Sequence, residues 1–208
     1  MKYLSTTYFA FLATLLGIIA VSSCTQNENI AGAWTGNAVR LENVPDAADA
    51  SAVITMDYAA PEQSRNNGRG GEVNLSALID VNQAVSAPNA ELVEPYEVSV
   101  AATASISGRY VFEDRDDDDV ILVLDPATLQ VNIDPAGVTY SQNLLTGKQQ
   151  PELDSLTTAT IGCWRVEITK AIRDEFYKYQ KISDIEIHHG NILSCEIEDR
   201  DYSFRKAQ

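Results

Sequence analysis

Apolar and polar residues alternate along much of the chain, and this alternation predicts antiparallel β-strands with one buried face. The pattern is clearest from Val73 to Val81 and from Tyr96 to Ile106, where every second residue is apolar. Parallel strands buried on both faces give unbroken apolar runs instead. Ser107-Gly108 predicts a turn after the second stretch. Shorter strands are predicted at 32–41, 54–58, 109–113, 120–124, 129–133, 185–187, 193–197 and 202–204.

The apolar spacing becomes helical near the C-terminus, and it predicts one α-helix of about five turns. Residues 135–156 give no clear pattern, although Pro151 is typical of the start of a helix. Most of the predicted strands follow one another without a helix between them. We therefore predict a mainly β fold, an antiparallel up-and-down barrel with one covering helix, with a β-sandwich or an incomplete barrel as the alternative. The residues with helical spacing are Ile161, Trp164, Ile168, Ile172, Phe176 and Tyr179.

The N-terminus has the features of a cleaved export signal. Lys2 precedes an apolar run over residues 8–21, which is shorter than a membrane span, and Val21-Ser22-Ser23-Cys24 follows. These four residues resemble the lipobox of bacterial lipoproteins. The resemblance implies a signal peptide over 1–23, lipid attachment at Cys24, a tether over 24–29 and a single domain over 30–208. An ordinary secretory signal with an incidental Cys24 is the alternative.

A second resemblance covers the two ends of the predicted barrel. Gly32-Ala33-Trp34 lies on the first strand, and Arg205 lies near the last. Together with the run of antiparallel strands, these residues are similar to the lipocalin superfamily, and more closely to the lipocalin-like lipoproteins of Bacteroidetes. The resemblance implies that Trp34 closes one end of the barrel beneath Arg205, with which it forms a structural pair.

The charge of the chain limits its partners. The formal net charge is −15, from 15 basic and 30 acidic residues, and the basic residues form no dense block. Such a charge repels phosphate backbones, so nucleic acid is excluded as a partner, and the expected membrane contact is through the lipid anchor. Thr25 follows Cys24 where a retention signal would have Asp, which favours the outer membrane, on its periplasmic side or at the cell surface.

Two cysteines remain after Cys24. Cys163 falls in the helical pattern and Cys195 in a strand pattern. An oxidising compartment allows a disulfide between them, and two separately buried thiols are the alternative. Neither has a histidine at metal-ligand spacing, so zinc is not expected.

Motifs of known chemistry are missing from the sequence, so we expect no enzyme, no catalytic residue and no cofactor. The run Glu113–Asp119 is the strongest local feature. Its alternating carboxylates Asp114, Asp116 and Asp118 are weak candidates for calcium, but a calcium loop would need a glycine for its turn. A solvated hairpin end is the expected role of this run.

Two functions are compatible with this sequence. Small residues facing the barrel interior would leave room for a small apolar ligand, as the lipocalin resemblance implies. Long loops at 42–50, 59–71 and 82–95 instead favour an envelope interaction protein with a filled core, whose loops bind a protein or a glycan. The interior positions concerned are Val98, Val100, Ala102 and Ala104.

Overall fold

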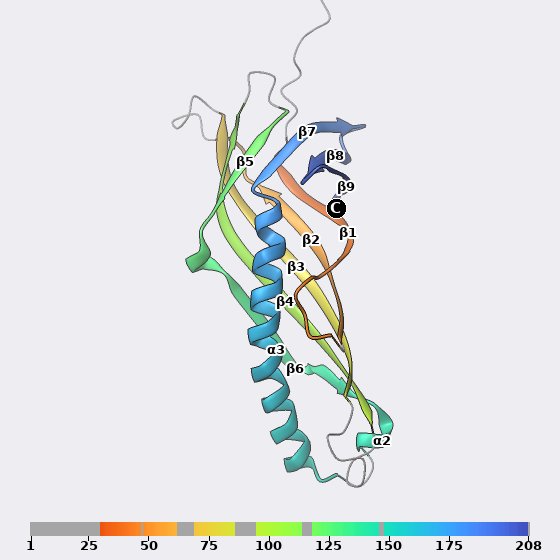
Figure 1. Ribbon diagram of the computed structural model, residues 1–208. Helices are drawn as coiled ribbons and strands as arrows, with labels where there is room; N and C mark the ends of the chain where they lie inside the picture. Colours follow the sequence, from red (N-terminus) through yellow and green to blue (C-terminus); the bar gives the residue numbers. More distant parts are fainter. Residues whose placement is uncertain are drawn as a thin grey trace, which may run out of the picture.

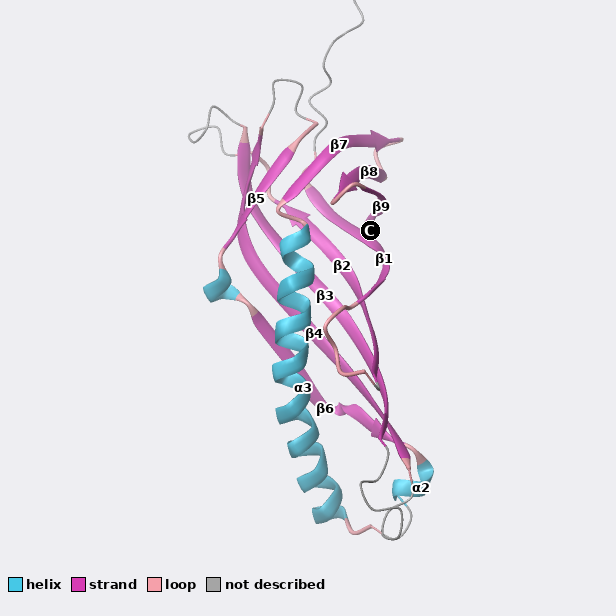
Figure 2. Ribbon diagram, in the orientation of Figure 1, coloured by secondary structure: helices cyan, strands magenta, loops and turns pink. Residues whose placement is uncertain are grey.

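The computed structural model describes residues 30–46, 48–61, 69–85, 95–113, 118–145 and 148–207. The predicted signal peptide, lipid attachment at Cys24 and tether fall outside these residues. Strands dominate the described chain, and one long helix crosses them (Figures 1 and 2). The strands are β1 (Gly32–Arg40), β2 (Ala48–Tyr58), β3 (Gly70–Val85), β4 (Tyr96–Phe112), β5 (Val120–Leu124), β6 (Gln130–Tyr140), β7 (Lys181–His188), β8 (Ile192–Ile197) and β9 (Arg200–Lys206). The helical segments are the 3₁₀ turn η2 (Pro126–Thr128), α2 (Gln142–Leu145) and α3 (Gln150–Lys178).

Eight strands form a closed antiparallel barrel. Consecutive strands are neighbours from β1 to β5 and from β7 to β9, and β1 pairs with β9 to close the ring. Strand β6 is an addition to the ring, because it pairs with the first part of β4 while β5 pairs with the last part. The predicted up-and-down barrel with one covering helix is confirmed, and the alternative of a sandwich or an incomplete barrel is wrong.

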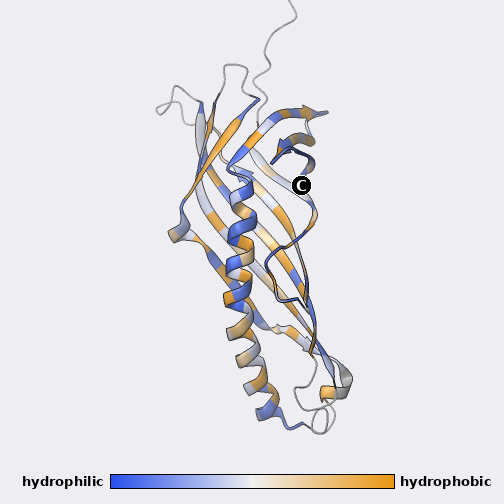
Figure 3. Ribbon diagram, viewed as in Figure 1, coloured by the Kyte–Doolittle hydropathy of each residue, from blue (hydrophilic) through white to orange (hydrophobic). Residues whose placement is uncertain are grey.

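The alternation of apolar residues places one face of each long strand inside. Val73, Leu75 and Ile79 of β3 are buried, and so are the predicted interior positions on β4, Val98, Val100, Ala102 and Ala104. Most outward positions between them are polar, with the exposed Leu78 as an exception, and Figure 3 shows hydrophobic and hydrophilic residues alternating along the ribbons. One described core results, which includes both the barrel wall and α3.

Strand β4 continues through Ser107-Gly108, where the sequence predicts a turn. It runs for 17 residues and pairs with β3 from Tyr96 to Val111. Gly108 permits this because β5 approaches closely there, and a Cβ on Gly108 would overlap the carbonyl oxygen of Val123. The glycine therefore serves a close strand contact, and the predicted turn is wrong.

Helix α3 is longer than its apolar spacing indicates. It begins at Gln150, where the Gln149 N–H donates to Glu152 Oε2 over 2.8 Å and Pro151 occupies the first turn. Residues 150–160 are at most half-buried, whereas the second half of the helix carries most of its buried side chains. These are Trp164, Ile168, Ala171, Ile172, Glu175 and Phe176.

Candidate functional site

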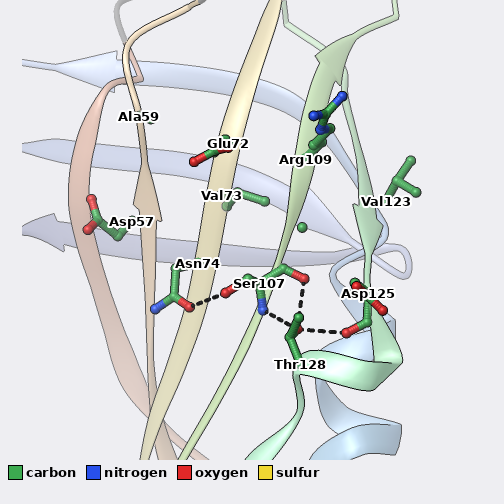
Figure 4. Close-up of a pocket in the computed structure, with 11 residues that line it drawn as sticks. Asp57, Ala59, Glu72, Val73, Asn74, Ser107, Arg109, Val123, Asp125 and Thr128 are labelled. Carbon is green, nitrogen blue, oxygen red and sulfur yellow. Dashed lines mark hydrogen bonds between the residues drawn. The ribbon is translucent and has the colours of Figure 1, made fainter.

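A hollow lies on the outer face of the sheet, over β2 to β5. It has a volume of about 510 Å³, within the range of small-ligand sites. Figure 4 shows Asp57 on one side of it, Asp125 and Thr128 on the other, and Asn74 and Ser107 between them. Its lining is Asp57, Ala59, Glu72, Val73, Asn74, Ser107, Gly108, Arg109, Val123, Asp125 and Thr128.

Strand register brings the polar side chains of the hollow into two rows. Asp57 of β2 is paired with Asn74 of β3, which is paired with Ser107 of β4. In the next row, Glu72 is paired with Arg109, and Arg109 with Val123 of β5. Because these positions alternate with buried residues, both rows point outward from the barrel.

Hydrogen bonds fix one wall of the hollow. The Ser107 hydroxyl donates to Asn74 Oδ1 over 3.2 Å, and the Ser107 N–H donates to Thr128 Oγ1 over 2.9 Å. The Thr128 hydroxyl is 2.7 Å from the Asp125 carbonyl oxygen, to which it donates. Asp125 Oδ1 accepts from Ala127 N–H at the start of η2 over 2.9 Å. Turn η2 is therefore held against β4 in one position.

The charged side chains of the hollow remain available to a ligand. Asp57, Glu72 and Asp125 carry negative charge and Arg109 carries positive charge. Within the described part of the chain, no carboxylate oxygen lies within 4.0 Å of the Arg109 guanidinium. The hollow thus offers three carboxylates, a guanidinium that no described carboxylate pairs with, and a wall of hydroxyl and amide groups. This combination suits a polar ligand with hydrogen-bonding groups. Neither histidine lines the hollow, since both lie on the β7–β8 hairpin.

The predicted pairing of Trp34 with Arg205 is wrong, because the cation over the Trp34 ring is Lys206. Trp34 is fully buried and donates from Nε1 to the Ile30 carbonyl oxygen over 2.7 Å, and Lys206 Nζ lies 5.0 Å from its ring centroid. The register pairs Trp34 with Lys206 and Thr35 with Arg205. Because successive side chains of a strand point to opposite faces, Arg205 is turned away from the ring.

The predicted disulfide is not formed in the structure. Cys163 is exposed on α3 and Cys195 is buried in β8, and both are free thiols. Burial raises the pKa of the Cys195 thiol to about 12. The thiols are therefore not both buried either, because only Cys195 is part of the core.

The acidic run lies partly outside the described residues, with Asp114 and Asp116 among those left out. Asp118 uses its carbonyl oxygen to accept the Ile185 N–H over 2.9 Å. Lys181 Nζ lies 3.3 Å from Glu113 Oε2 and 3.5 Å from Asp119 Oδ2, so these charges join β7 to the two ends of the β4–β5 connection. The residues that can be described contain no group of three or more metal-ligating side chains.

The predicted loops differ in how much of them is described. Most of 59–71 and 82–95 falls outside the described residues, or in β3. The loop at 42–50 is shorter than expected because β2 begins at Ala48. This loop contacts α3, since Asn43 Nδ2 donates to Asp174 Oδ2 over 3.3 Å and Glu42 lies 3.9 Å from Lys178.

The sequence did not predict the outer hollow. Its polar side chains are visible as the outward half of the alternation, but such positions line every strand with a solvated face. The hollow also depends on η2, which brings Asp125 and Thr128 to the sheet.

Comparisons of the chain with models of protein families, with curated proteins and with solved structures find no match. Among the described helices, none combines the length and the apolar character that a membrane span requires.

Proposed function

We propose that this protein is a lipid-anchored binding protein of the bacterial outer membrane, without catalytic activity, which holds its partner on the outside of the barrel. The proposed anchor is Cys24, on the evidence of the Val21-Ser22-Ser23-Cys24 sequence and the apolar run before it. The net charge of −15 supports a polar partner that is not a nucleic acid.

The packing of α3 is the observation that carries this proposal. Trp164, Ile168 and Phe176 project from one side of the helix and are at most 4% exposed. They belong to the same core as Val100 and Ala102 of the barrel wall. The small side chains that would leave room for an apolar ligand thus share one core with large side chains of α3. This favours the second function expected from the sequence, a filled core with recognition outside.

The outer hollow is the proposed binding site, and its polar lining indicates the class of ligand. Asn74, Ser107 and Thr128 supply amide and hydroxyl groups, and Arg109 supplies a guanidinium that no described carboxylate neutralises. Envelope glycan fragments and short peptides offer the matching hydroxyl, amide and carboxylate groups.

The experiment compares two Asn–Ser pairs that link β3 to β4. Asn74 accepts from Ser107 inside the hollow, and Asn82 accepts from Ser99 over 2.6 Å outside it. A panel of soluble cell-wall glycans and peptides is screened by NMR, and each ligand found is titrated against N74A, R109A and N82A.

We expect N74A and R109A to weaken binding about tenfold or more, since each removes one charge-assisted or neutral hydrogen bond from a bound ligand. N82A should bind within about threefold of the native chain because it breaks an equivalent pair elsewhere. Ligands that bind all three variants equally would exclude the hollow as the site.

A further inference from the structure

The outward face of α3 has an unusual charge distribution. Residues 155–164 include no charged side chain, although the chain has 45 Asp, Glu, Lys and Arg residues among 208. Three residues of this stretch lie opposite the buried face and are exposed, namely Ser155, Ala159 and Gly162. Val166, two residues after the stretch, lies on the same side and its side chain is 67% exposed. In Figure 2, α3 stands in front of the sheet, with no other element in front of it.

The two ends of this face carry opposite charges. Glu152 precedes the uncharged stretch, and Lys170 and Arg173 follow it, all three exposed. At 100° per residue, Glu152 and Lys170 lie at the same angle around the helix, 18 positions apart.

These positions are related by a two-fold exchange about the middle of the face, between residues 160 and 161. The exchange places Ser155 on Val166 and Ala159 on Gly162, and it places Glu152 within one residue of Lys170. Two antiparallel copies of the helix would therefore bring Ala159 against Gly162, Ser155 against Val166, and each acidic end against a basic end.

We propose that a second copy of this chain covers the outer face of α3, with the two helices antiparallel. Gly162 permits the close approach of a second backbone, since nothing lies within 4 Å of the position that a Cβ would take. Charge complementarity at both ends sets the direction, because parallel helices would place Lys170 on Lys170. The contact is at the small end of specific interfaces, so we expect a dissociation constant of about 10–100 µM.

Sedimentation equilibrium of the full chain tests the association. The variant A159E should abolish it, whereas T103E adds the same charge at an exposed position of β4 and should leave the dissociation constant within about threefold. A native chain that stays monomeric at about 500 µM would overturn the proposal. Binding of a different protein to this face would not support it.

Charge reversal tests the antiparallel arrangement. E152K and K170E should each raise the dissociation constant about tenfold, because each places like charges together across the contact. The double variant E152K/K170E should return it to within about threefold of the native value. Loss of the helix cap formed by Glu152 is common to E152K and the double variant, so it cannot account for recovery. A double variant as weak as the single variants would exclude the antiparallel pair.

Discussion

Lys206 Nζ lies 5.0 Å from the centroid of the Trp34 ring, and this contact joins the last strand of the barrel to the first. The ladder between β1 and β9 is short, with Trp34 paired to Lys206 and Thr35 to Arg205. The Ala207 N–H adds one hydrogen bond of 2.8 Å to the Ala33 carbonyl oxygen. A cation over an indole face is attracted by the ring quadrupole, so Lys206 strengthens a junction that has few backbone contacts.

Removal of this cation should weaken the barrel. We expect Lys206→Ala to lower the free energy of unfolding by about 0.5–1 kcal/mol, the range for an exposed cation–π contact. Arg205→Ala is the matched control, because Arg205 is exposed on the other face and its loss should change stability by less than about 0.5 kcal/mol. Urea denaturation followed by tryptophan fluorescence measures both. Equal effects would show that the contact with Trp34 contributes nothing of its own.

Substitution by alanine should have opposite effects on stability at two glycines. A Cβ on Gly108 would overlap the Val123 carbonyl oxygen, so Gly108→Ala must separate β4 from β5 and should cost about 2 kcal/mol or more. Gly162 lies in an exposed helix interior with open space around it, so Gly162→Ala should stabilise the chain by about 0.5–1 kcal/mol. Thermal unfolding of the two variants gives the comparison. A neutral Gly108→Ala variant would mean that the strands are not in close contact there.

Alkaline pH should reveal the buried thiol. Burial raises the pKa of Cys195 from its ordinary value of 9.0 to about 12. The Cys195 thiol therefore loses its proton at a lower pH in the unfolded chain than in the folded chain. Its contribution to the free energy of unfolding is complete below pH 9 and is lost as the pH rises from 9 towards 12. The expected slope is about 1.4 kcal/mol per pH unit in that window.

Variants at the two cysteines separate this effect from the loss of stability that other titrating groups cause at alkaline pH. Cys195→Val should flatten the fall in unfolding free energy between pH 9 and pH 10, because it removes the titrating group. Cys163→Ser should leave the slope unchanged, since Cys163 is exposed. Urea titrations at several pH values measure the slope, and an identical slope in both variants would contradict the assignment.

Tyr140 should hold the first half of α3 against β6. Its hydroxyl lies 3.1 Å from Thr160 Oγ1 and 3.4 Å from Thr157 Oγ1, and this half of the helix has few buried side chains. Tyr140→Phe should therefore cost about 1 kcal/mol. It should also increase amide hydrogen exchange in residues 150–160 more than in the second half of the helix.

Tyr177→Phe is the control for the helix, because Tyr177 lies in its second half and is only partly buried. This variant should leave exchange in residues 150–160 unchanged. Equal exchange in the two variants would show that Tyr140 does not hold that segment.

The strands were predictable where one face of the strand is buried and the other is exposed to solvent. Val73–Val81 and Tyr96–Ile106 show strict alternation, and both lie in long strands of the barrel wall. The second half of α3 was equally clear, because its buried side chains repeat with helical spacing. The first half is rich in threonine and at most half-buried, so it has no such repeat, and only Pro151 indicated where the helix begins.

Details that depend on register or on contacts between distant segments could not be predicted. An offset of one residue decides whether Arg205 or Lys206 faces Trp34, and residue type does not encode that offset. Gly108 resembled a turn residue because a close approach by β5 has no local sequence signal. The hollow formed by Asn74, Arg109 and Thr128 likewise requires three segments to meet.

Native mass spectrometry of the purified full chain tests the central claim most directly, namely that the core shared by the barrel and α3 has no room for an apolar ligand. We expect the measured mass to equal that of the protein alone, with no bound apolar molecule that organic extraction could remove. An added apolar probe should not bind. The variant Ile168→Ala, which opens space beside a fully buried residue, should take up the probe and thus serves as the positive control. A lipid that co-purifies with the native chain and leaves on extraction would contradict the account.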